Sequence, residues 1–330
     1  MRSARVERDR INVHETAAPA RTAGVALIRV RRVLLGSEDH LDFHRRRGFS
    51  GIPGRWFAGV VEDAGGGPVA AGTRVLADPE LPCGECPSCL AGLGTGCPHR
   101  SVAGVDALDG ALAEVIAVAP SRLVAIPEAV DDDHACFAAP LGRGILLGRR
   151  LGLAESSLIT VIGHGVAALC ASLALRLRHP RTRLLSDDPA TTAAAAQLGL
   201  PHRPVGDAGR RHDQDAVVDA SVSAASLEAS VGMIRPRGQI ALAAEAWDAV
   251  PAAVLRAIAA LELSVLGAPA GRSSDGLELL RRRSVDPLAA IVRRVGLEEA
   301  VSWMAAASPQ DLDGTLATFA TEAKIRVGGS

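Results

Sequence analysis

Tyrosine is missing from this 330-residue chain, and lysine occurs only once, at Lys324. Aromatic residues make up just 2% of the sequence, while arginine supplies all the other basic residues. This bias, together with the many alanines, is typical of a G+C-rich coding sequence rather than of a function. The chain also lacks an excess of charge, since its formal net charge is −1. No global field would therefore attract a nucleic acid or a membrane surface.

Long apolar runs are absent as well. The longest apolar stretches, 161–177 and 248–268, are interrupted by histidine, arginine or glutamate, so neither predicts a membrane span. The first fifteen residues are charged and contain no apolar segment of the kind found in signal peptides. We therefore expect a cytoplasmic protein, in which cysteine thiols stay reduced.

The pattern of short apolar runs changes along the chain. Residues 1–130 combine many glycines with short Val/Ile/Leu runs, which predicts a mainly antiparallel β domain. From about residue 155, apolar runs alternate with Ala/Leu-rich helical segments, which predicts βαβ units around a parallel sheet. The last sixty residues predict helices and a short strand over 323–327.

Four of the six cysteines lie within the stretch 82–97, "PCGECPSCLAGLGTGC". Their spacing is C-x2-C-x2-C-x7-C, and four thiolates fill the tetrahedral shell that Zn²⁺ prefers. A full shell leaves no position for water or substrate, so such a site stabilises the fold rather than catalyses. A redox C-x-x-C pair and an iron–sulfur cluster remain alternatives. The sequence predicts one structural zinc ion per chain. Its ligands would be Cys83, Cys86, Cys89 and Cys97.

A glycine-rich turn follows the apolar segment "LITVI". It reads Gly163-x-Gly165-x-x-Ala168, with His164 and Val166 inside the turn, and an apolar helix follows. This arrangement is typical of a turn that receives a dinucleotide pyrophosphate at a helix N-terminus. The alternative is an ordinary strand–helix turn without a ligand.

An acidic residue stands at the distance expected for a ribose-binding carboxylate. Asp187 lies nineteen residues beyond the end of the glycine turn. Such an acid binds the ribose hydroxyls of NAD and repels the extra phosphate of NADP. Arg181 and Arg183 lie nearby and complicate this choice. We predict NAD(H) in preference to NADP(H).

The cysteine stretch resembles the structural-zinc lobe of the medium-chain dehydrogenase/reductase family, the relatives of zinc alcohol dehydrogenase. The segments "VRRVLLGSEDH", "PGRWFAGVVEDAG", "VIGHGVAA" and "DAVVDAS" fall in the order and spacing of that family. The resemblance implies an α/β protein with a GroES-like β-rich domain, 1–145 and 272–330, and a doubly wound Rossmann domain, 146–271. It also implies that Ser221 borders the nicotinamide, that the substrate is a small molecule and that the protein is a homodimer.

The positions that hold a catalytic zinc ion in this family carry other residues here. The cysteine position is Leu35, and the His-Glu pair is replaced by Arg55 and Trp56. The remaining ligand position falls at Ala139 or Pro140. Leucine cannot bind a metal, and arginine stays protonated. We therefore predict that the catalytic zinc is absent.

Two residues at proton-relay positions of the family are retained, Ser37 and His40. A hydroxyl linked to a histidine can pass a proton without a metal. The alternatives are a turn serine and a surface histidine. Arg55 would polarise a carbonyl or bind a substrate anion, or else form an outward salt bridge or fill the vacated pocket.

A replacement metal site is the remaining alternative for this cleft. Cys136, His134 and His44 carry suitable ligand atoms, but nothing in their spacing indicates a site.

Taken together, these observations predict an NAD(P)-dependent oxidoreductase that transfers hydride between nicotinamide and an alcohol or carbonyl without a catalytic zinc, in specialised metabolism. The alternatives are a zinc-independent NADPH reductase of enones or quinones, and a non-redox or non-catalytic member of the family that binds the cofactor.

Overall fold

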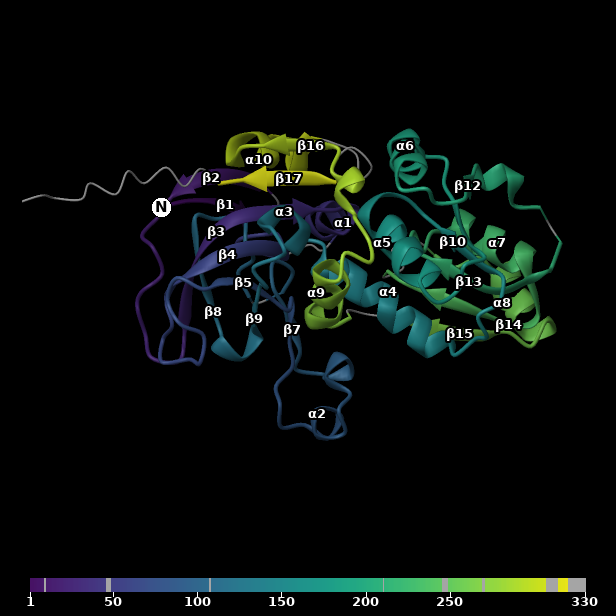
Figure 1. The fold of residues 1–330 in the computed structure, drawn as a ribbon, viewed down its shortest axis with the longest axis horizontal. Coiled ribbons are helices and arrows are strands. Elements are labelled where there is room, and N and C mark those ends of the chain that lie inside the picture. The colour runs from purple at the N-terminus through teal and green to yellow at the C-terminus, as the bar shows by residue number, and fades with distance from the viewer. Residues whose placement is uncertain are drawn as a thin grey trace, which may run out of the picture.

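The computed structural model describes residues 1–8, 10–45, 49–106, 108–209, 211–244, 249–268, 271–306 and 314–319. Figure 1 shows a β-rich part beside a layered part, in which helices cover a second sheet. The strand expected over 323–327 lies outside the described residues. None of the described helices combines the length and apolar character needed to cross a membrane.

A seven-stranded sheet forms the centre of the β-rich part. Its order is β16-β17-β3-β4-β5-β9, and β8 pairs with β3 as well. The pairs are antiparallel except for β16 with β17. Because β17 pairs with β3, a segment near the end of the chain completes the N-terminal sheet. The strands are β3 Ala26–Leu35, β4 Trp56–Asp63, β5 Arg74–Ala77, β8 Val115–Val118, β9 Leu123–Ala125, β16 Arg293–Val295 and β17 Thr315–Thr318.

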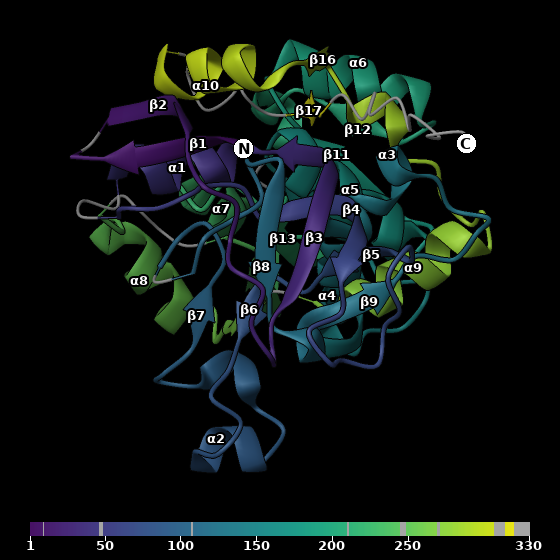
Figure 2. The same ribbon diagram turned by 90° about the vertical axis from the view of Figure 1, so that its left-hand side faces the viewer.

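Smaller elements surround this sheet. The hairpin β1 Arg2–Glu7 and β2 Arg10–Glu15 packs against helix α10, Leu297–Ala306 (Figure 2). Helix α1, Ser37–Arg45, directly follows β3. One lobe projects away from the body in both views (Figures 1 and 2). It contains β6 Glu80–Leu81, α2 Pro87–Leu90 and β7 Ser101–Val102.

The layered part is a six-stranded parallel sheet in the order β12-β11-β10-β13-β14-β15. Helices cover both faces, so the strands are near-continuous apolar runs, and all four residues of β10 are buried. Numbered from β10, the order is 3-2-1-4-5-6, in which ligands bind where the order reverses, beyond the ends of β10 and β13. The strands are β10 Ile159–Ile162, β11 Thr182–Leu185, β12 His202–Arg203, β13 Gln214–Asp219, β14 Ile234–Leu242 and β15 Ser264–Gly267. The helices are α5 Gly165–Arg176, α6 Pro189–Gln197, α7 Ala224–Met233 and α8 Ala252–Ala260.

A pair of helices connects the two parts. After the short helix α3, Asp132–Ala135, helix α4, Ala138–Leu151, runs toward the parallel sheet and packs against α9, Ser273–Arg281. The two helices touch through backbone, because a Cβ at Gly276 would lie 1.9 Å from the carbonyl oxygen of Ala138. The β-rich part and the doubly wound parallel sheet confirm the predicted α/β fold class.

Candidate functional site

The four lobe cysteines converge on one point. Their ligand atoms all lie within 4.8 Å of one another. The Sγ–Sγ distances are 3.9 Å for Cys83–Cys89, 3.7 Å for Cys86–Cys97 and 3.5 Å for Cys83–Cys97. Four sulfurs about 2.3 Å from a central Zn²⁺ would be separated by about 3.8 Å. The donor set and its spacing therefore fit a tetrahedral zinc ion.

Backbone groups of the lobe support this reading. The N–H of Gly84 donates to Cys89 Sγ at 3.3 Å, and the N–H of Cys83 donates to Cys97 Sγ at 3.4 Å. Such donors favour thiolates, which are the form that binds metal. Because the lobe projects from the body (Figure 1), an ion held there would stabilise the lobe away from the parallel sheet.

The glycine turn lies at the carboxyl end of β10. Gly163 has φ +148°, and a Cβ on it would lie 2.9 Å from Ala220 Cβ and 3.2 Å from Ser221 Oγ. Only glycine fits where this turn approaches the end of β13. His164 is the N-cap of α5, which begins at Gly165, and Val166 is buried in its first turn. The structure thus places five predicted residues where the strand order reverses: Gly163, His164, Gly165, Val166 and Ser221. This arrangement fits a dinucleotide-binding site.

The predicted ribose ligand lies at the same edge of the sheet. Asp187 follows β11 and is exposed, and its Oδ1 accepts the N–H of Val205 at 2.8 Å. One carboxylate oxygen is therefore already held on the β12 side.

A second link at this edge was not predicted. Asp188 accepts the backbone N–H of Thr191 at 2.7 Å, and Thr191 Oγ1 accepts the N–H of Gly165 at 2.7 Å. These bonds tie the start of α6 to the glycine turn.

Leu35 and Arg55, which the sequence resemblance assigns to catalytic-zinc positions, lie at adjoining ends of β3 and β4. The register pairs Leu34 with Trp56, so Leu35 and Arg55 lie together at one end of the sheet. Leu35 is fully buried, and the Arg55 side chain is only 11% exposed. An apolar side chain and a buried cation therefore occupy two positions that the sequence resemblance assigns to metal ligands.

Arg55 is surrounded by the carboxyl groups of α1. Its Nε donates to Asp39 Oδ1 at 3.2 Å, its Nη2 donates to Asp42, and its Nη1 lies 3.6 Å from Glu38 Oε2. Burial lowers the pKa of the guanidinium, but Asp39, Asp42 and Glu38 outweigh this effect and raise it. Burial also raises the pKa of Asp39, which Arg55 only partly offsets. The cation at position 55 is therefore permanent and internally paired.

A second arginine extends this network to the parallel sheet. Arg143 on α4 donates to both carboxylate oxygens of Glu38, and its Nη1 also donates to the carbonyl oxygen of Ala243 at 3.0 Å. Burial raises the pKa of Glu38, but Arg143 and Arg55 outweigh it and hold that pKa below its usual value. The Ala243 N–H in turn donates to the backbone carbonyl oxygen of Asp219 at the end of β13. The network therefore reaches the edge where the nucleotide turn lies.

The two guanidinium groups line one small pocket of about 40 Å³. Trp56 and Ala139, two further residues that the sequence resemblance places at or beside zinc-ligand positions, also line it. The complete lining is Arg55, Trp56, Pro79, Glu80, Val102, Ala139 and Arg143.

The proposed relay residues lie on α1, beside these carboxyl groups. Ser37 begins the helix and His40 follows three residues later, with exposures of 9% and 6%. The His40 ring packs on the ring of His44 at 4.1 Å, and His44 Nε2 contacts the carbonyl oxygen of Met304 at 3.2 Å. Both relay candidates are therefore fixed in a helix rather than on an exposed loop.

Cys136, His134 and His44, the alternative metal ligands, do not lie together in one site. His134 is paired with Asp131 and Asp286, whereas His44 contacts Met304. Within the part of the chain that the structure describes, the lobe cysteines form the one cluster of three or more metal-capable side chains.

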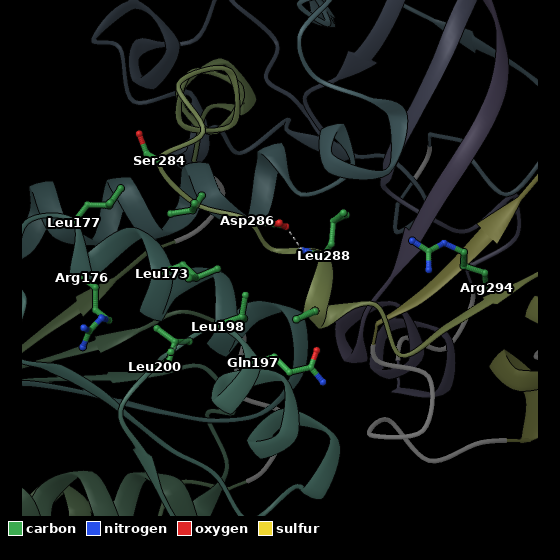
Figure 3. Close-up of a pocket in the computed structure, with 13 residues that line it drawn as sticks. Leu173, Arg176, Leu177, Gln197, Leu198, Leu200, Ser284, Asp286, Leu288 and Arg294 are labelled. Carbon is green, nitrogen blue, oxygen red and sulfur yellow. Dashed lines mark hydrogen bonds between the residues drawn. The ribbon is translucent and has the colours of Figure 1, made fainter.

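A larger groove of about 790 Å³ lies elsewhere (Figure 3). It is lined by leucines at the C-terminal ends of α5 and α6, with Arg176 and Arg294 toward its two ends. Arg294 is paired with Asp133 at 3.1 Å. Leu200, which precedes β12, places the groove at the amino edge of the parallel sheet, opposite the edge where such sheets bind nucleotides.

Comparison with known proteins adds to this geometry. Residues 22–128 match the family model of the alcohol dehydrogenase GroES-like domain. The D-altritol 5-dehydrogenase of Agrobacterium fabrum is 31% identical over 246 residues, 71% of this chain and 73% of that protein. The L-threonine 3-dehydrogenase of Chelativorans sp. is 30% identical over 154 residues, 46% of this chain and 44% of that protein.

A solved structure shares the fold over nearly the whole chain. It is described as a zinc-binding dehydrogenase from Sinorhizobium meliloti bound to NADP. The TM-score is 0.86 at 21% identity, covering 96% of this chain and 99% of the other.

Proposed function

This chain belongs to the medium-chain dehydrogenase/reductase family of NAD(P)-dependent oxidoreductases, which act on small molecules, and we propose that it interconverts an alcohol and a carbonyl without a catalytic zinc ion. The observation that carries the proposal is the guanidinium of Arg55. The sequence resemblance assigns it to a zinc-ligand position, and in the structure it is paired with three carboxyl groups. A fixed cation there repels Zn²⁺ and engages the carboxylates that could otherwise bind it.

The nicotinamide supplies or accepts the hydride when the cofactor is bound. The turn at Gly163 and the neighbouring Ser221 would hold the dinucleotide across the end of the sheet. Arg55 would donate hydrogen bonds to the substrate oxygen, where negative charge develops as a carbonyl is reduced. Ser37 and His40 would carry the proton between that oxygen and solvent.

One zinc ion per chain would be held by Cys83, Cys86, Cys89 and Cys97. Its chemistry is structural, because four thiolates complete its coordination. Asp187 would favour NAD(H) over NADP(H) through its charge.

The division of the chain is part of the same proposal: a catalytic GroES-like part, 1–145 and 272–330, and a nucleotide-binding part, 146–271. We also place the reaction in specialised metabolism, since the catalytic-metal positions of the family are all replaced.

A homodimer would form through the exposed edge of the parallel sheet. β15 is the last strand of the sheet, and three of its four residues are exposed, including Val265 at 44%. Leu255 on the adjacent α8 is 59% exposed. An uncovered edge with exposed apolar residues favours pairing with a second copy.

The activity is tested with NAD⁺ and a panel of secondary alcohols that includes D-altritol and L-threonine, the substrates in the names of two relatives. Stereospecific transfer of deuterium from the carbinol carbon to the cofactor is the expected result. No transfer from any alcohol of the panel would contradict the proposed oxidoreductase. A parent protein that binds NADH but transfers no deuterium would favour the non-catalytic alternative.

A further inference from the structure

The sequence singled out Arg55, but the structure places a second guanidinium beside it. Arg143 and Arg55 line the same pocket, and Glu38 pairs with both of them. The Arg143 side chain is only 15% exposed, so its position is set by packing and by Glu38. Its contact with the carbonyl of Ala243 fixes it between the β-rich part and the edge of the parallel sheet.

Arg143 has hydrogen-bonding capacity to spare. A guanidinium carries five N–H donors. Nη1 uses its donors on Glu38 and Ala243, and Nη2 uses one on Glu38. In the described part of the chain, no protein acceptor is recorded for the Nε–H or the second Nη2–H of Arg143, and Arg143 lines the pocket, so we infer that these donors can serve a molecule bound there.

The charges around the pocket limit what that molecule can be. Two guanidinium groups face the three carboxyl groups of Glu38, Asp39 and Asp42, so the cluster carries no positive excess. The remaining acid of the lining, Glu80, is itself paired with Arg100 at 3.3 Å. A carboxylate or phosphate would therefore gain little from the two cations and would lose its hydration. An uncharged oxygen can still accept the free N–H groups.

We propose that Arg143 is a second catalytic residue of this pocket. Arg143 and Arg55 together donate hydrogen bonds to the oxygen of an uncharged alcohol or carbonyl. Glu38 positions both arginines. This inference rests on the proposed function. In reduction, hydride adds to the carbonyl carbon, and the C=O π-electron pair moves to the oxygen. The oxygen then takes a proton from the Ser37–His40 relay. The guanidinium groups keep their protons and only stabilise the developing negative charge. Oxidation reverses each step.

The test compares R143Q and R143K with the parent, using the uncharged panel alcohol that the parent oxidises fastest; a parent that oxidised only L-threonine would contradict the assignment to an uncharged substrate. R143Q should lower kcat by roughly 10²–10³-fold, the usual cost of removing one oxyanion donor. R143K keeps the charge but loses the planar fork of donors, so its kcat should be intermediate. NADH affinity, measured by fluorescence titration, should stay at the parent value. The matched control is R149Q, which removes an exposed arginine of the same helix paired with Asp275 and should retain parent kcat.

Inhibition by a small anion tests whether the pocket binds a negatively charged group. Formate should not compete with the alcohol in the parent. Competitive inhibition by formate that disappears in R143Q would show an anion site and overturn the assignment to an uncharged substrate.

The outcomes separate the two proposals. If the parent transfers no deuterium, the proposed function fails, and this inference fails with it. If the parent and R143Q turn over at similar rates, only the role of Arg143 is overturned. Should R143Q fail to fold because Glu38 loses its partner, the double variant E38Q/R143Q removes both charges, and its kcat should fall as far. A double variant with parent kcat would contradict the proposal.

Discussion

Replacing Arg55 with methionine would remove the cation that three carboxyl groups of α1 share. The side chains involved are well buried: the exposed fractions are 11% for Arg55, 1% for Asp39, 11% for Asp42 and 14% for Glu38. Removing one partner of a buried ion pair typically costs about 3–5 kcal/mol. Methionine roughly fills the space of the arginine's aliphatic stem, so the change in stability should come mainly from the lost charge. We expect R55M to lower the free energy of unfolding by about 3–5 kcal/mol at neutral pH.

The loss of stability in R55M should depend on pH, because the carboxyl groups around position 55 titrate. Burial already raises the pKa of Asp39, and losing Arg55 would raise it further. A carboxyl group whose folded-state pKa lies above its unfolded value destabilises the folded state at neutral pH, and this penalty fades as the pH falls toward about 4. In the parent, the pKa of Glu38 is lowered, so its contribution is present above its unfolded pKa and is lost as the pH falls through its folded pKa. The deficit of R55M should therefore shrink between neutral pH and about pH 4.5.

The measurement is urea unfolding at two pH values, followed by circular dichroism and tryptophan fluorescence. R149M is the matched control, because Arg149 pairs with Asp275 but is 60% exposed. It should cost at most about 1 kcal/mol. If R55M lost no more stability than this control, or if its deficit grew on acidification, the buried network would not be the ion cluster described.

The remaining predictions concern the metal lobe, the cofactor and the relay. C97S should lose zinc and become sensitive to proteolysis within the lobe, while NADH titration stays at the parent value; a loss of NADH binding would contradict a purely structural ion. D187A should weaken NADH binding about tenfold or more through the lost charged hydrogen bonds and should improve NADPH binding. Unchanged affinity for both cofactors would remove the role of Asp187. S37A and H40A should each lower kcat by roughly 10²-fold or more with little change in NADH affinity, and full activity in both would show that the proton leaves by another route.

Local sequence patterns were sufficient to predict much of the fold. The four cysteines lie within fifteen residues, so the chain between them determines whether they can converge. The turn at Gly163 directly follows a continuous apolar run that forms a buried strand and opens an apolar helix, so the glycine spacing and its two flanking segments are local in the sequence. The family resemblance predicted that the C-terminal segment 272–330 completes the first domain, but the pairing of β17 with β3 joins distant segments and was not predicted.

The network around the pocket could not be predicted in the same way. Position 55 was recognised because a motif marks it, but its pairing with Asp39 and Asp42 depends on how α1 turns back over the end of the sheet. Glu38 and Arg143 are 105 residues apart and belong to no shared motif. Arg143 lies in a helix whose sequence shows only amphipathic spacing, so nothing local distinguishes it from Arg149.

Metal analysis of the purified protein tests the central claim most directly. The account predicts one zinc ion per chain in the parent and none after C97S, because the four lobe cysteines, whose sulfurs converge, are the proposed ligands. It also predicts that R55M, which frees three carboxyl groups, is the variant in which additional metal could bind. Two zinc ions per parent chain, or one retained in C97S, would place a metal in the cleft and contradict an arginine-based pocket.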